Sequence, residues 1–232
     1  MTVTTGAGRI DVVAGAEYAQ LGEATLSEVA RRVLAVDDLH RATAVLQPVS
    51  YDIGTVSTCA LLRAVGRATV GGRTARWSAF VKVLQSPLAW ELLHVIPDHL
   101  RDRFVREFPW RLEIDALRSP VRSVLPDCLR MPELYAVHEP DDLHAALWME
   151  DVDERTGPWS LDTFARAARL LGELAGRRPV GSEAAFGDPL VRLQPGFGLR
   201  MYAESRVKHE SAQVFASDAT WADPVLVAAL DD

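Results

Sequence analysis

Two strand-like runs separated by a glycine pair stand out in the pattern of apolar and polar positions. Residues 76–84 are mostly β-branched, aromatic or apolar, which is typical of a strand, and a second such run covers 57–70. Gly71-Gly72 lies between the two runs, and a glycine pair in that position is typical of a hairpin turn. The pattern therefore predicts an antiparallel hairpin.

Lys82 occupies an unusual place in the second run. The alternation of a strand puts Phe80, Lys82 and Leu84 on one face, and a lysine between two large apolar side chains loses hydration and needs an anion. Residues 109–119 read as a helix with proline in its first turn, and Glu113 lies on the apolar side of that helix. We therefore predict that Lys82 and Glu113 form an ion pair.

The remaining elements follow from periodicity and turn residues. We expect an α+β fold with an antiparallel sheet and a glutamate-bearing helix. The other expected elements are a helix at 24–39 that braces the sheet, a first strand at 45–53, short helices within 86–108, strands at 134–138 and 144–152, a helix with a buried apolar stripe at 161–178, a loop at 181–198, and helices at 199–210 and 222–230.

Four motifs follow one another in an order that is similar to that of a known protein family. They are Trp77-Ser-x-Phe-Val-Lys-Val-Leu84, Pro109-Trp-Arg-x-Glu113, Leu125-Pro-x-x-Leu-Arg-x-Pro132 and Leu147-Trp-Met-Glu-Asp-Val152. This order resembles the aminoglycoside phosphotransferase-like family of small-molecule kinases over roughly residues 49–178. The resemblance implies a helical lead-in at 1–44, a protein-kinase-like N-lobe and hinge at 45–153, and the first helices of a truncated helical C-lobe at 154–232.

The resemblance also implies ATP and magnesium as cofactors and a small-molecule substrate. Lys82 would hold the phosphates and Glu113 would orient it, as in the kinase fold. Phe80 would stack on adenine, while free backbone groups at Glu150 and Val152 would bind the adenine edge. Ser57 would donate to the phosphates from the turn at 54–57, although an ordinary hairpin turn explains that stretch equally well.

The catalytic residues of the family are missing. The family uses a His-Gly-Asp-x-x-x-x-Asn loop and a second metal-binding aspartate, yet none of the six histidines is followed by Gly-Asp. Asp188 is interpreted as a turn residue. We therefore expect the nucleotide-binding part of a phosphotransferase that does not phosphorylate on its own.

Three alternatives remain open. The chain is a repurposed kinase fold that binds or transforms a natural-product or peptide intermediate, with Lys82 and Glu113 in acid–base roles. It pairs with itself or with a complementing chain that supplies the missing lobe. In the third alternative, Lys82 and Glu113 form only a structural salt bridge in an α+β domain.

Composition narrows the class of protein further. The 232 residues carry a formal charge of -7, which argues against nucleic acid or an anionic membrane as the main partner. No apolar run approaches the roughly 20 residues of a membrane span, and the N-terminus does not resemble a leader, so we expect a cytoplasmic protein. Cys59 and Cys128 are expected to be buried thiols, and no metal site is expected at His94 or His99.

Overall fold

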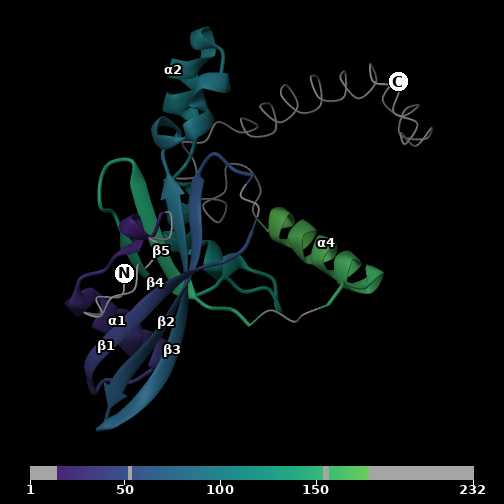
Figure 1. Ribbon diagram of the computed structural model, residues 1–232. Helices are drawn as coiled ribbons and strands as arrows, with labels where there is room; N and C mark the ends of the chain where they lie inside the picture. The colour runs from purple at the N-terminus through teal and green to yellow at the C-terminus, as the bar shows by residue number, and fades with distance from the viewer. Residues whose placement is uncertain (1–14, 52–53, 154–156, 178–232) are drawn as a thin grey trace. The chain divides into compact units, whose positions relative to one another are not determined.

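The fold is α+β and is built on one five-stranded antiparallel sheet, with strand order β1-β2-β3-β5-β4 (Figure 1). This computed structural model describes residues 15–51, 54–153 and 157–177, all of which lie in the first of two units into which the chain divides, Met1–Leu190. The strands are β1 (Leu39–Pro48), β2 (Thr58–Val70), β3 (Arg73–Gln85), β4 (Leu134–His138) and β5 (His144–Glu150).

The helices of the described residues are α-helices and short 3₁₀ helices. They are η1 (Ala16–Ala19), α1 (Glu23–Leu34), η2 (Pro87–Ala89), η3 (Glu91–Val95), α2 (Asp98–Glu107), α3 (Leu112–Arg118), η4 (Pro120–Val124) and α4 (Leu161–Gly176). None of them is long and apolar enough to cross a bilayer.

The predicted hairpin is confirmed as β2 and β3. Val70 pairs with Arg73, and the two residues between them have φ of 52° at Gly71 and 74° at Gly72. Positive φ at both positions is the geometry of the turn that best matches the twist of a two-residue hairpin, and glycine adopts it without strain. The strand β4 lies where the pattern predicts it, and β5 begins at the predicted residue but ends at Glu150, two residues before the predicted end.

One face of the sheet packs against α1. Trp77 and Val81 of β3 and Trp148 of β5 are buried there, together with Val29 and Ala30 of α1. Figure 1 shows α1 lying along the sheet beside β1. The predicted brace is therefore present, but the helix ends at Leu34 instead of residue 39, because Ala35 takes a left-handed conformation as its C-cap.

The first strand begins earlier than predicted. It runs over Leu39–Pro48, whereas the expectation was 45–53. Ala42, Ala44 and Leu46 point into the core, and Pro48 ends the strand because it has no N–H for the ladder. The expected boundary between a lead-in at 1–44 and a lobe at 45–153 thus falls inside β1. The residues of β1 share one core with α1 and β2.

The opposite face of the sheet packs against α3 over β3, β5 and β4. Leu84, Leu147 and Met149 are buried there around Ile114 of α3, which is fully buried. Phe80 lies at the edge of this cluster and is half-buried. The prediction that Phe80, Lys82 and Leu84 share one face is therefore confirmed.

The stripe of α4 is not buried, contrary to the expectation. Leu161 is 87% exposed and Leu171 is 59% exposed, and no residue of α4 is buried within the described part of the chain. Ser160 caps the helix by accepting the Thr163 N–H at 3.2 Å, so local contacts define its start. The segments predicted at 181–198, 199–210 and 222–230, and Asp188, lie outside the described residues.

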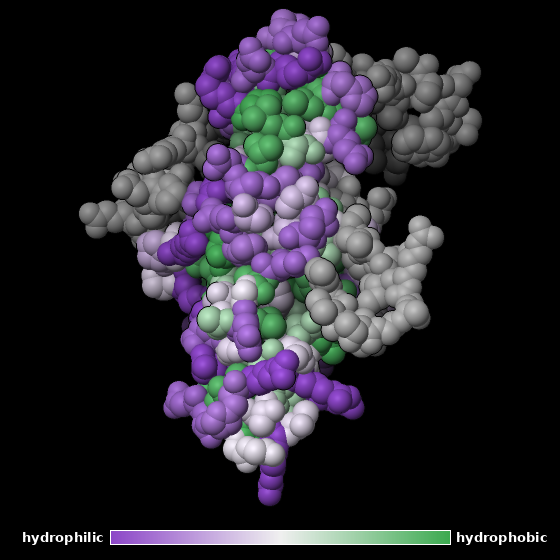
Figure 2. All heavy atoms as spheres, turned by 60° about the vertical axis from the view of Figure 1, so that its left-hand side comes forward, coloured by the Kyte–Doolittle hydropathy of each residue, from purple (hydrophilic) through white to green (hydrophobic). Residues whose placement is uncertain are grey.

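Besides the exposed apolar residues of α4, a second apolar surface lies on the segment 86–111 between β3 and α3. Trp90, Phe104 and Phe108 form a small aromatic cluster inside that segment, whereas Leu88 and Leu92 are exposed on it. Figure 2 shows hydrophobic side chains gathered at the upper end of the view within a ring of hydrophilic ones. The expected short helices at 86–108 are present as η2, η3 and α2.

We predict that Gly66→Ala destabilises the fold by about 1–3 kcal/mol, because a new Cβ on β2 would collide with the Thr43 carbonyl and the Trp77 indole. Gly22→Ala is the matched control, since a Cβ at Gly22 meets nothing within 4 Å. Urea unfolding measures both variants. Equal stability of the two would mean that β1, β2 and the Trp77 ring are not packed as described.

Candidate functional site

The predicted ion pair is present. Lys82 Nζ on β3 lies 2.6 Å from Glu113 Oε2 on α3, and the two side chains are 24% and 39% exposed. Glu113 is adjacent to Ile114, whose burial against the sheet fixes the rotation of the helix. The short helix begins at Leu112 rather than at Pro109, after a turn in which the Leu112 N–H donates to the Pro109 carbonyl at 3.0 Å.

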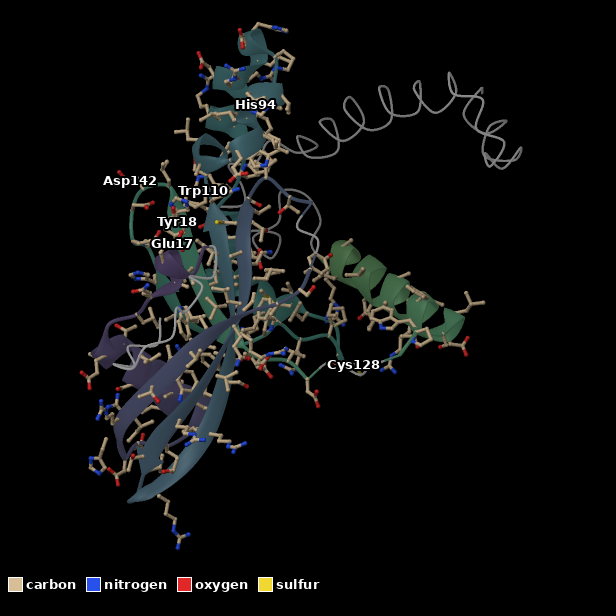
Figure 3. All side chains as sticks on the ribbon, viewed as in Figure 1. Glu17, Tyr18, His94, Trp110, Cys128 and Asp142 are labelled. Carbon is tan, nitrogen blue, oxygen red and sulfur yellow. The ribbon has the colours of Figure 1, made fainter. Side chains whose placement is uncertain are left out.

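Two arginines hold α3 at its ends. Arg111 belongs to the motif that contains Glu113, but the sequence pattern did not predict the partner of either arginine. At the first end Arg111 pairs with Glu139 of the β4–β5 turn and stacks over the Trp110 ring, 5.1 Å from its centroid. Trp110 is labelled in Figure 3. These contacts pin the start of α3 to the sheet.

The second clamp follows the helix. Arg122 in η4 donates to the Glu133 carboxylate at 2.9 Å and to the carbonyls of Pro132 at 2.9 Å and Met131 at 3.3 Å. Because α3 is clamped on both sides of Glu113, that carboxylate is preorganised against Lys82 without any ligand.

The cation at this site is a lysine in a chain that rarely uses lysine. Lys82 and Lys208 are the only two lysines in the sequence, and the other 23 of the 25 basic side chains are arginines. A lysine ammonium is a compact charge with three rotatable donors, so it can contact a carboxylate and a second anion together. The choice of lysine therefore suits a position that serves two anions.

The face that carries Lys82 is closed on one side and open on the other. Helix α3 covers it over β5 and β4, whereas over β1 and β2 it bears Val45 and Val65, which are 40% and 39% exposed. Lys82 pairs in register with Leu61 of β2, and Phe80 pairs with Arg63. Lys82 thus lies at the border of the open half, where a ligand can reach it.

The expected hinge differs from the prediction at Glu150. Its backbone N–H is not free, because it donates to the Glu133 carbonyl at 2.8 Å. Its carboxylate forms a bidentate pair with Arg130, at 2.5 and 2.9 Å. This Arg130 hydrogen bond, together with one from the Glu133 N–H, lowers the pKa of Glu150 below its ordinary 4.5 against the opposing effect of burial. Val152 follows the strand and is exposed.

A further ion pair crosses the open face beside the end of β5. Arg63 Nε on β2 lies 3.0 Å from Asp151 Oδ1, just after β5, so the pair spans β3 next to Phe80. Alternation along β2 places Arg63 on the Lys82 face, but the register that brings it to Asp151 cannot be read from the side-chain pattern.

Ser57 is not brought next to Lys82. Its carbonyl accepts the Gln85 N–H at 2.9 Å, which ties the turn to the end of β3. Thr58 pairs with Leu84, so Ser57 lies beyond that end of the strand. A contact from Ser57 to a phosphate that also reaches Lys82 remains a prediction.

Another polar cluster, at the β4–β5 turn, is structural. Asp141 accepts the N–H groups of Leu143 and His144, each at 2.8 Å, and its carboxylate contacts the His144 ring. The His144 ring is buried beneath Tyr18, with which it stacks at 3.6 Å. Figure 3 shows Tyr18 beside this turn. The stacked imidazole is closed to ligands.

The expectation of two buried thiols is wrong for Cys128. Cys59 is half-buried, but Cys128 is exposed in the loop before β4 and has a φ of 73° (Figure 3). Within 15–51, 54–153 and 157–177, no three His, Cys, Asp or Glu side chains group closely enough to hold a metal ion, His94 and His99 included.

A double-mutant cycle over Lys82→Met and Glu113→Gln should give a coupling free energy of about 0.5–1 kcal/mol, because both side chains are partly exposed. Urea unfolding of the two single variants and the double variant measures it. A coupling indistinguishable from zero would show that the two side chains do not meet in solution.

The Glu150 pair predicts an acid limb in the stability of the protein. Its folded-state pKa is lowered, so its contribution is present above pH 4.5 and is lost as the pH falls through the folded-state pKa. Glu150→Gln should lower stability at neutral pH and flatten the acid limb, and Arg130→Gln should do the same. Thermal unfolding followed from pH 7 to pH 3 checks this, and an acid limb as steep as that of the wild type in both variants would contradict it.

No protein-family model matches this chain, and neither a curated protein nor a solved structure matches it. The motif order and the geometry above are therefore the basis on which a function is proposed.

Proposed function

We propose that this chain is the nucleotide-binding part of an ATP-dependent small-molecule phosphotransferase, with a protein-kinase-like N-lobe. The observation that carries the proposal is the 2.6 Å pair between Lys82 on a central strand and Glu113 on the helix that packs over it. A strand lysine paired with a helix glutamate is the arrangement that positions phosphates in protein kinases.

The order of elements supports the same proposal. A hairpin that ends in the lysine strand is followed by the glutamate helix, then by two strands, and the last of these leads out to Val152. The sheet places β5 directly beside β3, with Lys82 opposite Leu147. The exit from β5 therefore lies on the same sheet as the lysine, as a hinge must.

The residues present fit nucleotide phosphates better than they fit magnesium. Lys82 has donors beyond the one directed at Glu113, and Phe80 offers a half-buried ring two residues away on the same face. The carboxylates nearest to this face, Glu113 and Asp151, each pair with a cation. We therefore propose nucleotide binding without phosphoryl transfer by this chain alone.

The repurposed fold remains the alternative. The Glu150 N–H is engaged by Glu133, and the Arg63–Asp151 pair lies across β3 where a purine would approach Phe80. These two features favour a natural-product or peptide ligand that leaves the hinge unused. Such a ligand would contact Phe80 and Lys82 without displacing the Glu133 hydrogen bond.

Association is proposed in either case. The exposed stripe of α4, with Leu161, Phe164 and Leu171, is an apolar surface of the kind that marks protein contacts. A second copy of the chain or a complementing chain would bury it.

Calorimetric titration with ATP and magnesium tests the proposal. We expect saturable binding that Lys82→Ala weakens roughly tenfold or more, because a charge-assisted hydrogen bond to phosphate is lost. Arg169→Ala, in exposed α4, is the control and should bind as the wild type does. Absence of binding at millimolar ATP, or equal binding by the Lys82→Ala variant, would contradict the nucleotide assignment. Wild-type binding of apolar ligands instead of ATP would favour the alternative.

A further inference from the structure

The three strands β1, β2 and β3 contain no acidic residue. Its strands carry Arg41, Arg63, Arg67, Arg73, Arg76 and Lys82 but no Asp or Glu. The whole chain holds 32 acidic against 25 basic side chains, so the charge is segregated rather than mixed. In this acidic protein, every Asp, Glu, Lys or Arg side chain on these three strands is therefore a cation.

Most of these cations share the open face with Lys82. Alternation from Lys82 through Phe80 reaches Arg76 on β3, and Arg63 and Arg67 take the same face of β2. The neighbours Trp77 and Ala68 are buried on the opposite side, which confirms the alternation. Arg41 of β1 pairs in register with Thr69, next to Arg67 on this side of β2. We call Arg41, Arg63, Arg67, Arg76 and Lys82 the basic face.

Within the part of the chain that the structure describes, no acidic side chain balances the charge at the far end of this face. Arg67 pairs in register directly with Arg76, and like charges in that position destabilise a sheet. Among the described residues neither arginine has an ion-pair partner, whereas Lys82 and Arg63 meet Glu113 and Asp151. An anion bound here would relieve the repulsion.

Apolar surface lies between the cations. Lys82 and Arg76 are six residues apart on β3, or roughly 20 Å at 3.4 Å per residue. The exposed Val45 and Val65 and the half-buried Phe80 lie within that span. Cations that border apolar and aromatic surface provide what single-stranded nucleic acid requires, which is contact with both phosphates and base faces.

The type of cation points the same way. Four of the five side chains on the basic face are arginines, whose planar guanidinium binds phosphate in a bidentate fashion and also stacks on flat rings. The formal charge of -7 is an average over the chain, and it does not describe the field above this one surface.

We propose that the basic face binds single-stranded nucleic acid along β2 and β3, from Arg67 and Arg76 toward Lys82. This activity goes beyond the proposed nucleotide site, because it depends on arginines that no mononucleotide at Lys82 would reach. A chain of phosphates lies between the unbalanced arginines at one end and the lysine at the other, with bases against the apolar residues.

Fluorescence anisotropy with a labelled oligodeoxythymidine of about 20 nucleotides, titrated at several salt concentrations, tests this inference. Arg67→Glu should weaken binding roughly tenfold or more at low salt, and Arg67→Ala should reduce the slope of log K against log salt by about 0.7. Arg169→Glu, in exposed α4, is the matched control and should bind as the wild type does.

Arg67→Glu also separates binding from folding. The new carboxylate would lie opposite Arg76, so the melting temperature should stay equal or rise while oligonucleotide binding falls. Absence of oligonucleotide binding by the wild type at low salt, equal binding by Arg67→Glu, or preferred binding to anionic phospholipid vesicles or an acidic peptide would overturn the proposal.

A parallel ATP titration distinguishes this inference from the nucleotide site. Arg67→Glu should bind ATP as the wild type does, and in that case a loss of oligonucleotide binding supports a separate surface. If the wild type binds the oligonucleotide in an Arg67-dependent manner but does not bind ATP, the basic face stands and only the nucleotide site fails.

Discussion

The burial of Ile114 is the contact on which the candidate site depends. Ile114 packs into the cluster formed by Leu84, Leu147 and Met149, and this fixes which side of the seven-residue helix α3 faces the sheet. This orientation of α3 places the Glu113 side chain beside Lys82, at the border of the sheet surface that α3 covers. A helix this short has little stability of its own, so the tertiary contacts and the arginine clamps at its ends hold it in place.

The two faces of the sheet differ in how far helices cover them. One face is closed by α1 and gives the domain its core, while the other is half closed by α3 and half open over β1, β2 and β3. The open half carries apolar residues and arginines, and Lys82 lies at its border. Any ligand of this domain that uses Lys82 must therefore approach over the open half, which also carries the arginines of the basic face.

The sequence was a good guide wherever local patterns decide the structure. The hairpin followed from Gly71-Gly72, and the pairing of Lys82 with Glu113 followed from the cost of burying a charge. The start of β1 was missed because its first residues look polar. The engagement of the Glu150 N–H could not be foreseen because the carbonyl that a backbone N–H meets depends on the pairing register, which the side-chain pattern does not specify. The exposed stripe of α4 has the periodicity of a core helix, and periodicity alone cannot say what lies against it.

Nucleotide binding at Lys82 can be tested directly because the chain contains only two lysines. An ATP derivative with an acyl phosphate transfers its acyl group to a lysine amine near the phosphates, forming an amide and releasing the nucleotide. Mass spectrometry then compares Lys82 with the only other lysine, Lys208. We expect selective labelling of Lys82 that excess ATP suppresses. Equal labelling of both lysines, unaffected by ATP, would contradict it.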